Sequence, residues 1–250
     1  MVIEKQKLTK RAYKVFIEGE LINLCIPNEE AIELDGWADW FNDLKNQKNT
    51  RHGIFPNTSQ NQKRILKEIQ SQIDKVDNQE ILALLICEKK NNQAFGICSL
   101  QSINFSNKSA EIAINIGNPG LSSMPGMASL ESMALLAEHG FRVMGLERIY
   151  AGQAYPNLLR WNKLMEIIGF KTEGITRNTF KKGHDVSDTV LIACNYEDYL
   201  ILRDIRGSLW GDLSLIKRAL KAQPKLSIAE KINEAMLEIE KEHFKFIFNK

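Results

Sequence analysis

Residues 112–136 follow the order strand, glycine-rich loop, helix, an arrangement that can bind a phosphate group. A loop that enters a helix presents several backbone N–H groups without partners, and with the helix dipole these attract an anion. Gly126 and Ala128 are small enough to let a diphosphate approach the backbone. A purely structural turn would also contain glycines. The loop alone therefore does not distinguish a phosphate-binding site from a structural turn, and the rest of the sequence is needed.

The loop lacks two common nucleotide-binding signatures. No Gly-Lys-Ser/Thr follows it, so it is not a P-loop. It contains no G-x-G-x-x-G, and short turns join the strands before it, as in an antiparallel meander. Strand order and the absent fingerprint therefore exclude a nucleotide-binding oxidoreductase.

The elements around this loop predict one large domain with an extension. Apolar alternation and turn residues predict a short hairpin or one bent strand at 13–26, and strands at 81–87, 93–103, 109–116, 146–153, 170–177 and 189–194. Helical spacing of apolar residues predicts helices at 29–44, 58–73, 128–144, 157–168, 212–222 and 227–244. We expect an α+β fold over residues 1–202, with a mixed, mostly antiparallel central sheet and helices on both faces. A C-terminal helical extension would follow at 203–250.

Composition and charge narrow the class of protein. Of the 250 residues, 44% are hydrophobic and 26% charged, and the net charge of +2 gives no electrostatic basis for binding nucleic acid. Residues 1–11 lack the apolar segment of a secretory signal, and no apolar run is long enough to span a bilayer. We therefore expect a cytoplasmic protein that binds neither nucleic acid nor membrane.

The cysteines and histidines show no metal-binding pattern. The cysteines lie in apolar runs without a CxxC pair: Cys25, Cys87, Cys98 and Cys194. The four histidines have no ligand-like spacing either. We predict buried free thiols in a reducing compartment, and no metal.

The order of the elements resembles that of the GNAT superfamily of N-acetyltransferases. The family's loop signature is Gln/Arg-x-x-Gly-x-Gly/Ala, and the corresponding residues here are Ser123-Met124-Pro125-Gly126-Met127-Ala128. A strand at 146–153, an asparagine-containing turn and a helix ending in Gly169-Phe170 are similar to its second signature. The stretches 173–174 and 183–190 resemble the branch that acetylates ribosomal-protein N-termini and amino sugars. The resemblance covers about residues 21–200.

The resemblance implies a binding site for acetyl-CoA, with the pantetheine arm between two diverging central strands. Backbone N–H groups would polarise the thioester carbonyl. The implied coenzyme-binding residues are Ile114, Ile116, Ser123, Met124, Pro125, Gly126, Met127, Ala128, Asn157, Trp161 and Asn162. Asn157 and Asn162 are alternatives for the family's asparagine, and Trp161 has a core position as its alternative role.

Direct attack by a neutral amine requires a base, and the leaving thiolate can take a proton from an acid. Glu111 is our first candidate for the base, acting through water, and His184 is the second. The alternative role for Glu111 is a solvated carboxylate at a strand edge. Met165 stands where many family members have a tyrosine acid, so Tyr155 is the candidate acid unless the thiolate leaves unaided.

The resemblance therefore implies an acetyl-CoA-dependent N-acetyltransferase. The favoured acceptor is an amino sugar nucleotide, and a peptide N-terminus is the next choice. The residues considered for acceptor contacts, or as anchors of the first helix, are Trp37, Trp40, Arg51, His52 and Phe55. The alternative from another class is a non-catalytic CoA-binding or interaction module, which Met165 and Ser123 favour. The C-terminal helices are candidates for a homodimer interface.

Overall fold

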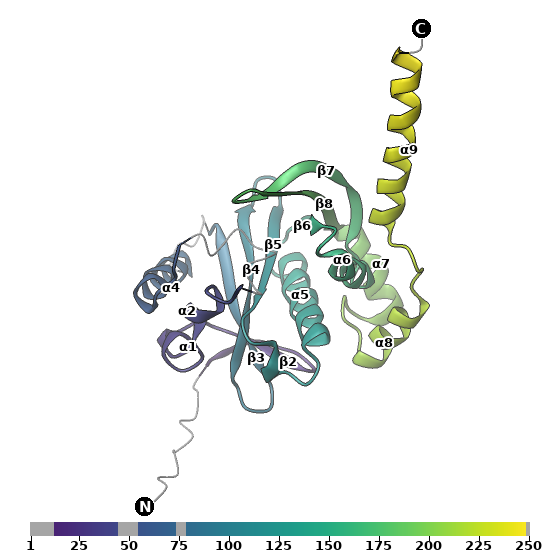
Figure 1. Ribbon diagram of the computed structural model, residues 1–250. Coiled ribbons are helices and arrows are strands. Elements are labelled where there is room, and N and C mark those ends of the chain that lie inside the picture. Colours follow the sequence, from purple (N-terminus) through teal and green to yellow (C-terminus); the bar gives the residue numbers. More distant parts are fainter. Residues whose placement is uncertain (1–12, 45–54, 74–78, 249–250) are drawn as a thin grey trace, which may run out of the picture.

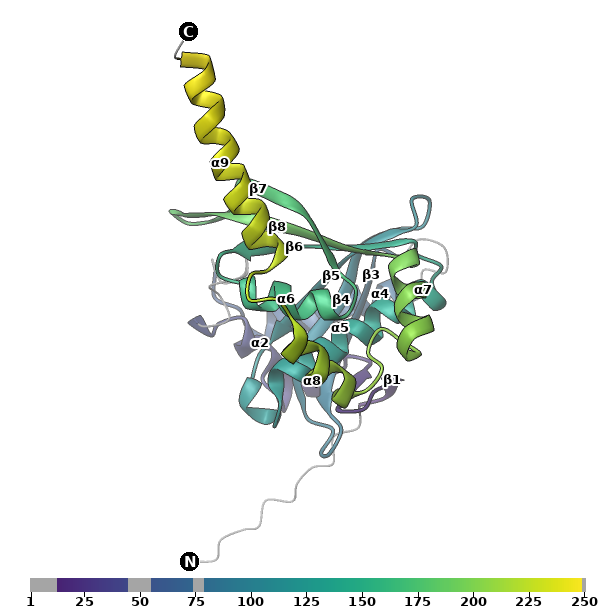
Figure 2. The same cartoon turned by 90° about the vertical axis from the view of Figure 1, so that its right-hand side faces the viewer.

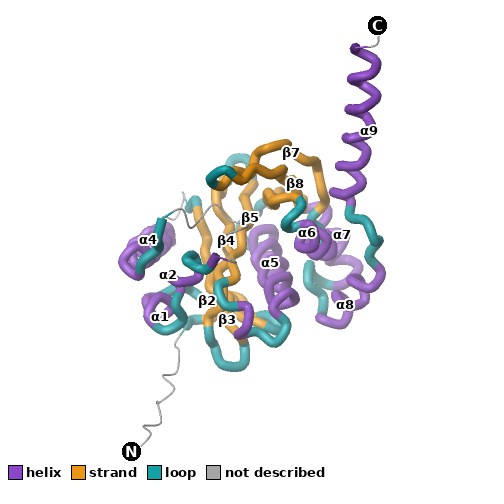
Figure 3. The backbone as a smooth tube through the Cα atoms, in the orientation of Figure 1, coloured by secondary structure: helices purple, strands orange, loops and turns teal. Residues whose placement is uncertain are grey.

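The computed structural model describes residues 13–44, 55–73 and 79–248. Its strands form a sheet in the order β1-β2-β3-β4-β5-β6-β8-β7. Neighbouring strands are antiparallel except β5 and β6, which are parallel. Figures 1 and 3 show this sheet with helices on both of its faces. The predicted α+β fold, with a mostly antiparallel sheet, is confirmed.

The strands are β1 (Val15–Glu18), β2 (Ile22–Cys25), β3 (Ile81–Glu88), β4 (Ala94–Asn104), β5 (Ser109–Ile116), β6 (Arg148–Tyr155), β7 (Lys171–Lys182) and β8 (Asp185–Asn195). The helices are α1 (Glu29–Glu33), α2 (Trp37–Trp40), α4 (Ser59–Ile73), the 3-10 turn η1 (Pro119–Leu121), α5 (Pro125–Arg142), α6 (Leu159–Ile167), α7 (Tyr196–Arg206), α8 (Leu213–Ala222) and α9 (Ile228–Phe248).

Two hydrophobic cores lie on opposite faces of the sheet. The larger core joins α5 to inward-facing residues of β2 to β6 and β8, and it continues into α6 and α7. The smaller core joins α1, α2 and α4 to the other face of β2, β3 and β4. Because side chains alternate along a strand, each residue of the central strands can be assigned to one of these faces.

Three local predictions differ from the structure. Helical structure was expected only from residue 203, but α7 already begins at Tyr196. The helix expected at 29–44 is divided into α1 and α2, because Gly36 adopts a left-handed conformation with φ of 68°. The strands expected at 170–177 and 189–194 are longer and form a hairpin that turns at Gly183, where φ is 60°. Figure 1 shows this hairpin arching over the upper end of the sheet.

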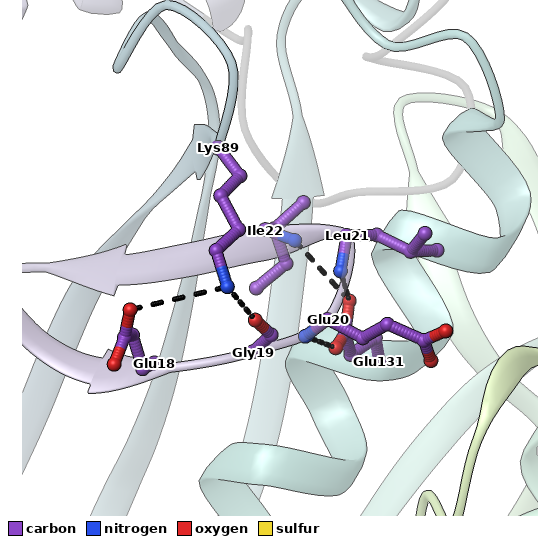
Figure 4. Close-up of polar contacts among 7 residues, drawn as sticks. All are labelled: Glu18, Gly19, Glu20, Leu21, Ile22, Lys89 and Glu131. Atoms are coloured by element: carbon purple, nitrogen blue, oxygen red, sulfur yellow. Dashed lines mark hydrogen bonds and ion pairs between the residues drawn. The ribbon is translucent and has the colours of Figure 1, made fainter.

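The hairpin of β1 and β2 is hydrogen-bonded to α5 through a buried carboxylate. Glu131 is fully buried, and one of its oxygens accepts hydrogen bonds from the N–H groups of Leu21 and Ile22 at 2.8 and 3.2 Å. The other oxygen accepts from the N–H of Glu20. Figure 4 shows the three bonds converging on Glu131, with Lys89 beside them. Burial raises the pKa of this carboxyl group, and the three N–H donors oppose the rise.

The C-terminal helices pack against the body of the protein over part of their length. The expected boundary between residues 202 and 203 falls within α7. Four residues beyond that boundary belong to the larger core: Leu209, Trp210, Ile216 and Ala229. The C-terminal half of α9 extends away from the sheet in both views (Figures 1 and 2).

Three further observations concern the cysteines, metal-binding groups and membrane-spanning helices. All four cysteines are buried and free, as predicted. Among the described residues, no group of three His, Cys, Asp or Glu side chains could hold a metal ion. No helix in the described part of the chain is long and apolar enough to cross a membrane.

Candidate active site

The central strands β5 and β6 separate along part of their length. They are paired at three positions, of which the last joins Glu111 to Tyr150. Beyond it, β5 continues to Ile116 and β6 continues to Tyr155 without pairing to each other. Each keeps its other neighbour, β4 or β8. The backbone groups that face this opening therefore lack strand partners and can bind a ligand that carries amide groups.

The opening leads to the start of α5. No side chain of the described residues caps this helix, and Pro125 is its first residue. The N–H groups of Gly126 and Met127 have no acceptor within the helix by its geometry. A Cβ atom added at Gly126 would meet no described atom within 4 Å, so there is open space beside this residue. This is the arrangement expected for a diphosphate site.

The other loop residues have different surroundings. Ser123 is exposed, and Met124 is half-buried with its N–H directed to the hydroxyl of Ser122 at 3.3 Å. Ala128 is 1% exposed, and its N–H is bonded to the carbonyl of Met124. The small side chain of Ala128 therefore packs in the core, and its N–H belongs to the helix. Gly117 is small for another reason, since a Cβ there would lie 1.9 Å from the indole of Trp40.

Two buried amide oxygens lie on the α5 side of the opening. Asn162 of α6 is 1% exposed, and its Nδ2 donates to Thr172 at 3.4 Å, while its Oδ1 has no partner in the part of the protein that the structure describes. Gln153 is 4% exposed, and its Oε1 has no protein partner among the described residues. By alternation with Ile149, Gln153 lies on the face that packs on α5. A buried acceptor without a donor is costly, and the N–H groups of pantetheine would supply donors here.

Gln153 is not among the site residues that were predicted from the sequence. Its signal was a polar residue at an inward-facing position of an otherwise apolar strand.

Ile114 and Ile116 lie on the same α5 side and pack against the larger core, as the predicted site requires. Trp161 is half-buried against that core, and Asn157 is exposed in the turn before α6. Of the two asparagines, the structure buries Asn162.

The opposite face of the opening carries Glu111. Its neighbours Ala110 and Ile112 belong to the larger core, so alternation directs Glu111 to the other side of the sheet. Glu111 is half-buried, and its carboxylate makes no hydrogen bond or ion pair with any described residue. Tyr150 stands opposite it on the same face, and sequence analysis missed this residue because the pairing of β5 with β6 decides its position. The candidate coenzyme and acceptor sides are thus separated by the sheet.

The two other candidate catalytic residues lie away from Glu111. Tyr155 is half-buried at the end of β6, five residues beyond Tyr150, which corresponds to about 16 Å of strand. Burial raises the pKa of Tyr155, as do Glu230, Asp188 and Glu234, so the phenol stays protonated at neutral pH. His184 is exposed at the tip of the β7–β8 hairpin. It is nine residues from Ala193, the partner of Tyr150, or about 30 Å of strand.

The remaining candidates are placed as follows. Met165 is fully buried in the larger core. Trp37 and Trp40 are 1% and 4% exposed, which makes them core residues rather than acceptor contacts. Phe55 is 82% exposed, and Arg51 and His52 lie outside the described residues.

Comparison with known proteins agrees with this fold. The family model of the GNAT acetyltransferase domain matches residues 33–191 of this sequence. The chain therefore belongs to the GNAT acetyltransferase family. It is an N-acetyltransferase.

Solved structures share the fold at low sequence identity. Mycobacterium smegmatis RimJ, in complex with CoA-disulfide, is 14% identical, with a TM-score of 0.62 over 80% of this chain and 88% of its own. The microcin C7 self-immunity acetyltransferase MccE, in complex with acetyl-CoA and AMP, is 18% identical, with a TM-score of 0.58 over 71% and 93%. A chimera of the spermidine N-acetyltransferase SpeG from Vibrio cholerae with hSSAT is 16% identical, with a TM-score of 0.56 over 72% and 99%. No curated protein sequence matches the chain.

Proposed function

We propose that the chain transfers the acetyl group of acetyl-CoA to a primary amine that approaches Glu111 from the face opposite α5. The observation that carries this proposal is the separation of β5 from β6 directly after the Glu111–Tyr150 pair. Acetyl-CoA would lie on the α5 side, with its diphosphate at Gly126 and its pantetheine near Asn162 and Gln153. The coenzyme-bound structures of RimJ and MccE support a coenzyme as the acetyl donor in this fold.

The reaction needs no covalent intermediate on the protein. Glu111 takes a proton from the ammonium, through water, and the neutral amine attacks the thioester carbon. A C–N bond forms, the C–S bond breaks and the thiolate leaves, while the nitrogen loses its second proton to solvent as the amide forms. Tyr155 stays the candidate donor of the proton that the thiolate takes up, and solvent is the alternative.

The acceptor we favour is an amino sugar nucleotide, and a peptide N-terminus is the second choice. The tip of the β7–β8 hairpin carries Lys181 and Lys182, with His184 next to them. The positive charge of the two lysines favours an acceptor with a diphosphate over a polyamine. The MccE structure contains AMP as well as acetyl-CoA, which supports room for a nucleotide in this fold.

The test combines binding with transfer. Acetyl-CoA, but not NAD or ATP, should raise the melting temperature, because a ligand of the native state stabilises it by mass action. Acetylation is then measured on an amino sugar nucleotide, a peptide with a free N-terminus, and spermidine. Transfer to the sugar nucleotide alone supports the favoured acceptor, and transfer to the peptide alone selects the second choice. Tight coenzyme binding without transfer to any amine would instead indicate a CoA-binding module.

We also propose that α9 mediates a homodimer. Its far end carries exposed apolar side chains, with Ile239 67%, Phe246 68% and Ile247 47% exposed. Truncation after Lys241 removes two of these residues and leaves the ion pair between Arg177 and Glu240, 2.6 Å apart. The mass measured by light scattering should halve, and an unchanged mass would rule out this end of α9 as the interface.

A further inference from the structure

Tyr150 faces Glu111 across the last paired position of β5 and β6, where the strands separate. We propose that the carboxylate of Glu111 and the phenol oxygen of Tyr150 together form the binding site for the acceptor ammonium group. The inference rests on the proposed function and assigns a residue of its acceptor side. The ligand class is a primary amine in its protonated form.

The register of the strands brings the two side chains together. Residues paired in register on neighbouring parallel strands point to the same face, and their Cβ atoms lie about 5 Å apart, the spacing of adjacent strands. Glu111 lies on the face opposite α5, so Tyr150 does too. An ammonium group is small enough to contact a carboxylate and a phenol oxygen at once, because each hydrogen bond spans about 2.8 Å.

The ring of Tyr150 is held in place by a neighbouring ion pair. The guanidinium carbon of Arg148 lies 5.9 Å from the centre of the ring. Two nitrogens of Arg148 donate to the two carboxylate oxygens of Glu173, at 2.7 and 2.6 Å. Glu173 neutralises the positive charge of Arg148, which would otherwise repel a cationic acceptor. The pair therefore orients the phenol and keeps the site suitable for an ammonium.

Small residues continue the same face beyond the pair. Ala113 follows Glu111 on β5, and Gly152 follows Tyr150 on β6. Leu191, the partner of Gly152 on β8, is 39% exposed. Two small residues at the start of the opening leave room for the carbon that bears the amine.

Glu111 and Tyr150 have different roles, which follow from the chemistry of a carboxylate and a phenol. The ammonium donates one hydrogen bond to the phenol oxygen and one toward Glu111, directly or through water. Glu111 then takes the proton, and the nitrogen is left with a lone pair for the thioester carbon. Tyr150 neither gains nor loses a proton, so it acts by binding the amine.

The test replaces only the hydroxyl group. Tyr150→Phe keeps the ring beneath Arg148, and Tyr196→Phe, on α7, is the matched control. KM is measured for whichever of the sugar nucleotide, the peptide and spermidine the wild type acetylates fastest, and Kd is measured for acetyl-CoA. Tyr150→Phe should raise the acceptor KM about tenfold, as expected for one lost hydrogen bond to a charged group. Its kcat and acetyl-CoA Kd should stay at the wild-type values, as should every constant of the control.

Three outcomes would overturn the inference. An unchanged acceptor KM in Tyr150→Phe rejects the role of Tyr150 and leaves the proposed function standing. A weaker acetyl-CoA Kd of similar size would show a structural role for the hydroxyl group. A wild-type protein that binds acetyl-CoA but acetylates none of the three amines contradicts the proposed function, and the amine site is rejected with it.

Discussion

Glu20, in the turn between β1 and β2, accepts a hydrogen bond at 2.9 Å from the indole nitrogen of Trp210, 190 residues further along the chain. The same carboxylate oxygen accepts from the N–H of Leu213, also at 2.9 Å. The backbone N–H of Glu20 is bonded to Glu131 of α5. The segment between α7 and α8 is thereby joined, through one turn, to the helix whose first turn forms the candidate diphosphate site.

Removing the indole donor should therefore destabilise the whole domain. Trp210 is 4% exposed in the larger core, and Trp210→Phe keeps an aromatic ring but leaves Glu20 without this partner. We expect the free energy of unfolding to fall by about 2 kcal/mol, because the lost hydrogen bond ends on a charged group. The melting temperature should fall by about 4–8 °C, by the scaling for a chain of this size. A melting temperature equal to that of wild type would show that the segment is not coupled to the core.

Local patterns predicted most of the elements but not their contacts. The order from the meander through the glycine-rich loop to the helix ending at Gly169-Phe170 follows from apolar periodicity and turn residues, which act over short distances in sequence. The bond from Leu21 to Glu131 spans 110 residues, and no local pattern encodes it. The break at Gly36 was missed because the apolar spacing of 29–44 continues across the glycine.

The candidate site, like the fold, could be predicted only in part from the sequence. Glu111 and the loop could be chosen from residue type and order, together with the family resemblance. The position of Tyr150 depends on which residue of β5 it faces, and that is a property of tertiary pairing. The unsatisfied oxygen of Gln153 likewise depends on which elements bury it, although its place among apolar neighbours was a visible signal.

The buried carboxylate of Glu131 predicts a specific dependence of stability on pH. Burial raises its pKa in the folded protein, so the folded state holds the proton more tightly than the unfolded state does. Its contribution to the free energy of unfolding is greatest below the ordinary carboxyl pKa and declines as pH rises to the folded pKa. Glu131→Gln cannot ionise, so its stability curve should lack this decline.

Urea unfolding at several pH values, from about 4 to 7, measures both curves for the carboxyl range. Glu242→Gln is the control, because the side chain of Glu242 is 82% exposed. Parallel curves for wild type and Glu131→Gln would show that Glu131 does not titrate differently in the two states.

Gln153→Met should change stability and coenzyme affinity in opposite directions. Met has a similar shape and no polar atom, so it removes a buried acceptor without a partner. We expect the ligand-free protein to be more stable by about 1 kcal/mol. If pantetheine supplies the donor, the Kd for acetyl-CoA should rise about tenfold, which a calorimetric titration would measure.

Gln72→Met is the matched control for that experiment. Gln72 is 3% exposed, but its Oε1 accepts from the N–H of Glu80 at 3.1 Å. This variant should lose stability and keep the wild-type Kd. A Gln153→Met variant that behaves in the same way would show that Gln153 has only a structural role.

Gly126→Ala tests the diphosphate site separately from the pantetheine site. The added Cβ meets no protein atom within 4 Å, and alanine favours the helix by up to about 1 kcal/mol, so the fold should be at least as stable. The methyl group enters the space assigned to the diphosphate, so acetyl-CoA should bind more weakly. S-acetylpantetheine, which lacks the diphosphate, should bind the variant and the wild type equally. Equal acetyl-CoA affinities would place the diphosphate elsewhere.

Glu111→Gln should remove the base while leaving the coenzyme site intact. Glutamine cannot take a proton from the ammonium, so kcat/KM for the acceptor should fall about 100-fold to 10,000-fold, the usual contribution of such a group. The Kd for acetyl-CoA should be unchanged, because Glu111 lies on the face opposite α5. Glu147→Gln is the control, since this residue forms a surface ion pair with Lys108. If Glu111→Gln keeps most of its activity and His184→Ala loses it, the base is His184, and the hairpin tip must then reach the opening between β5 and β6.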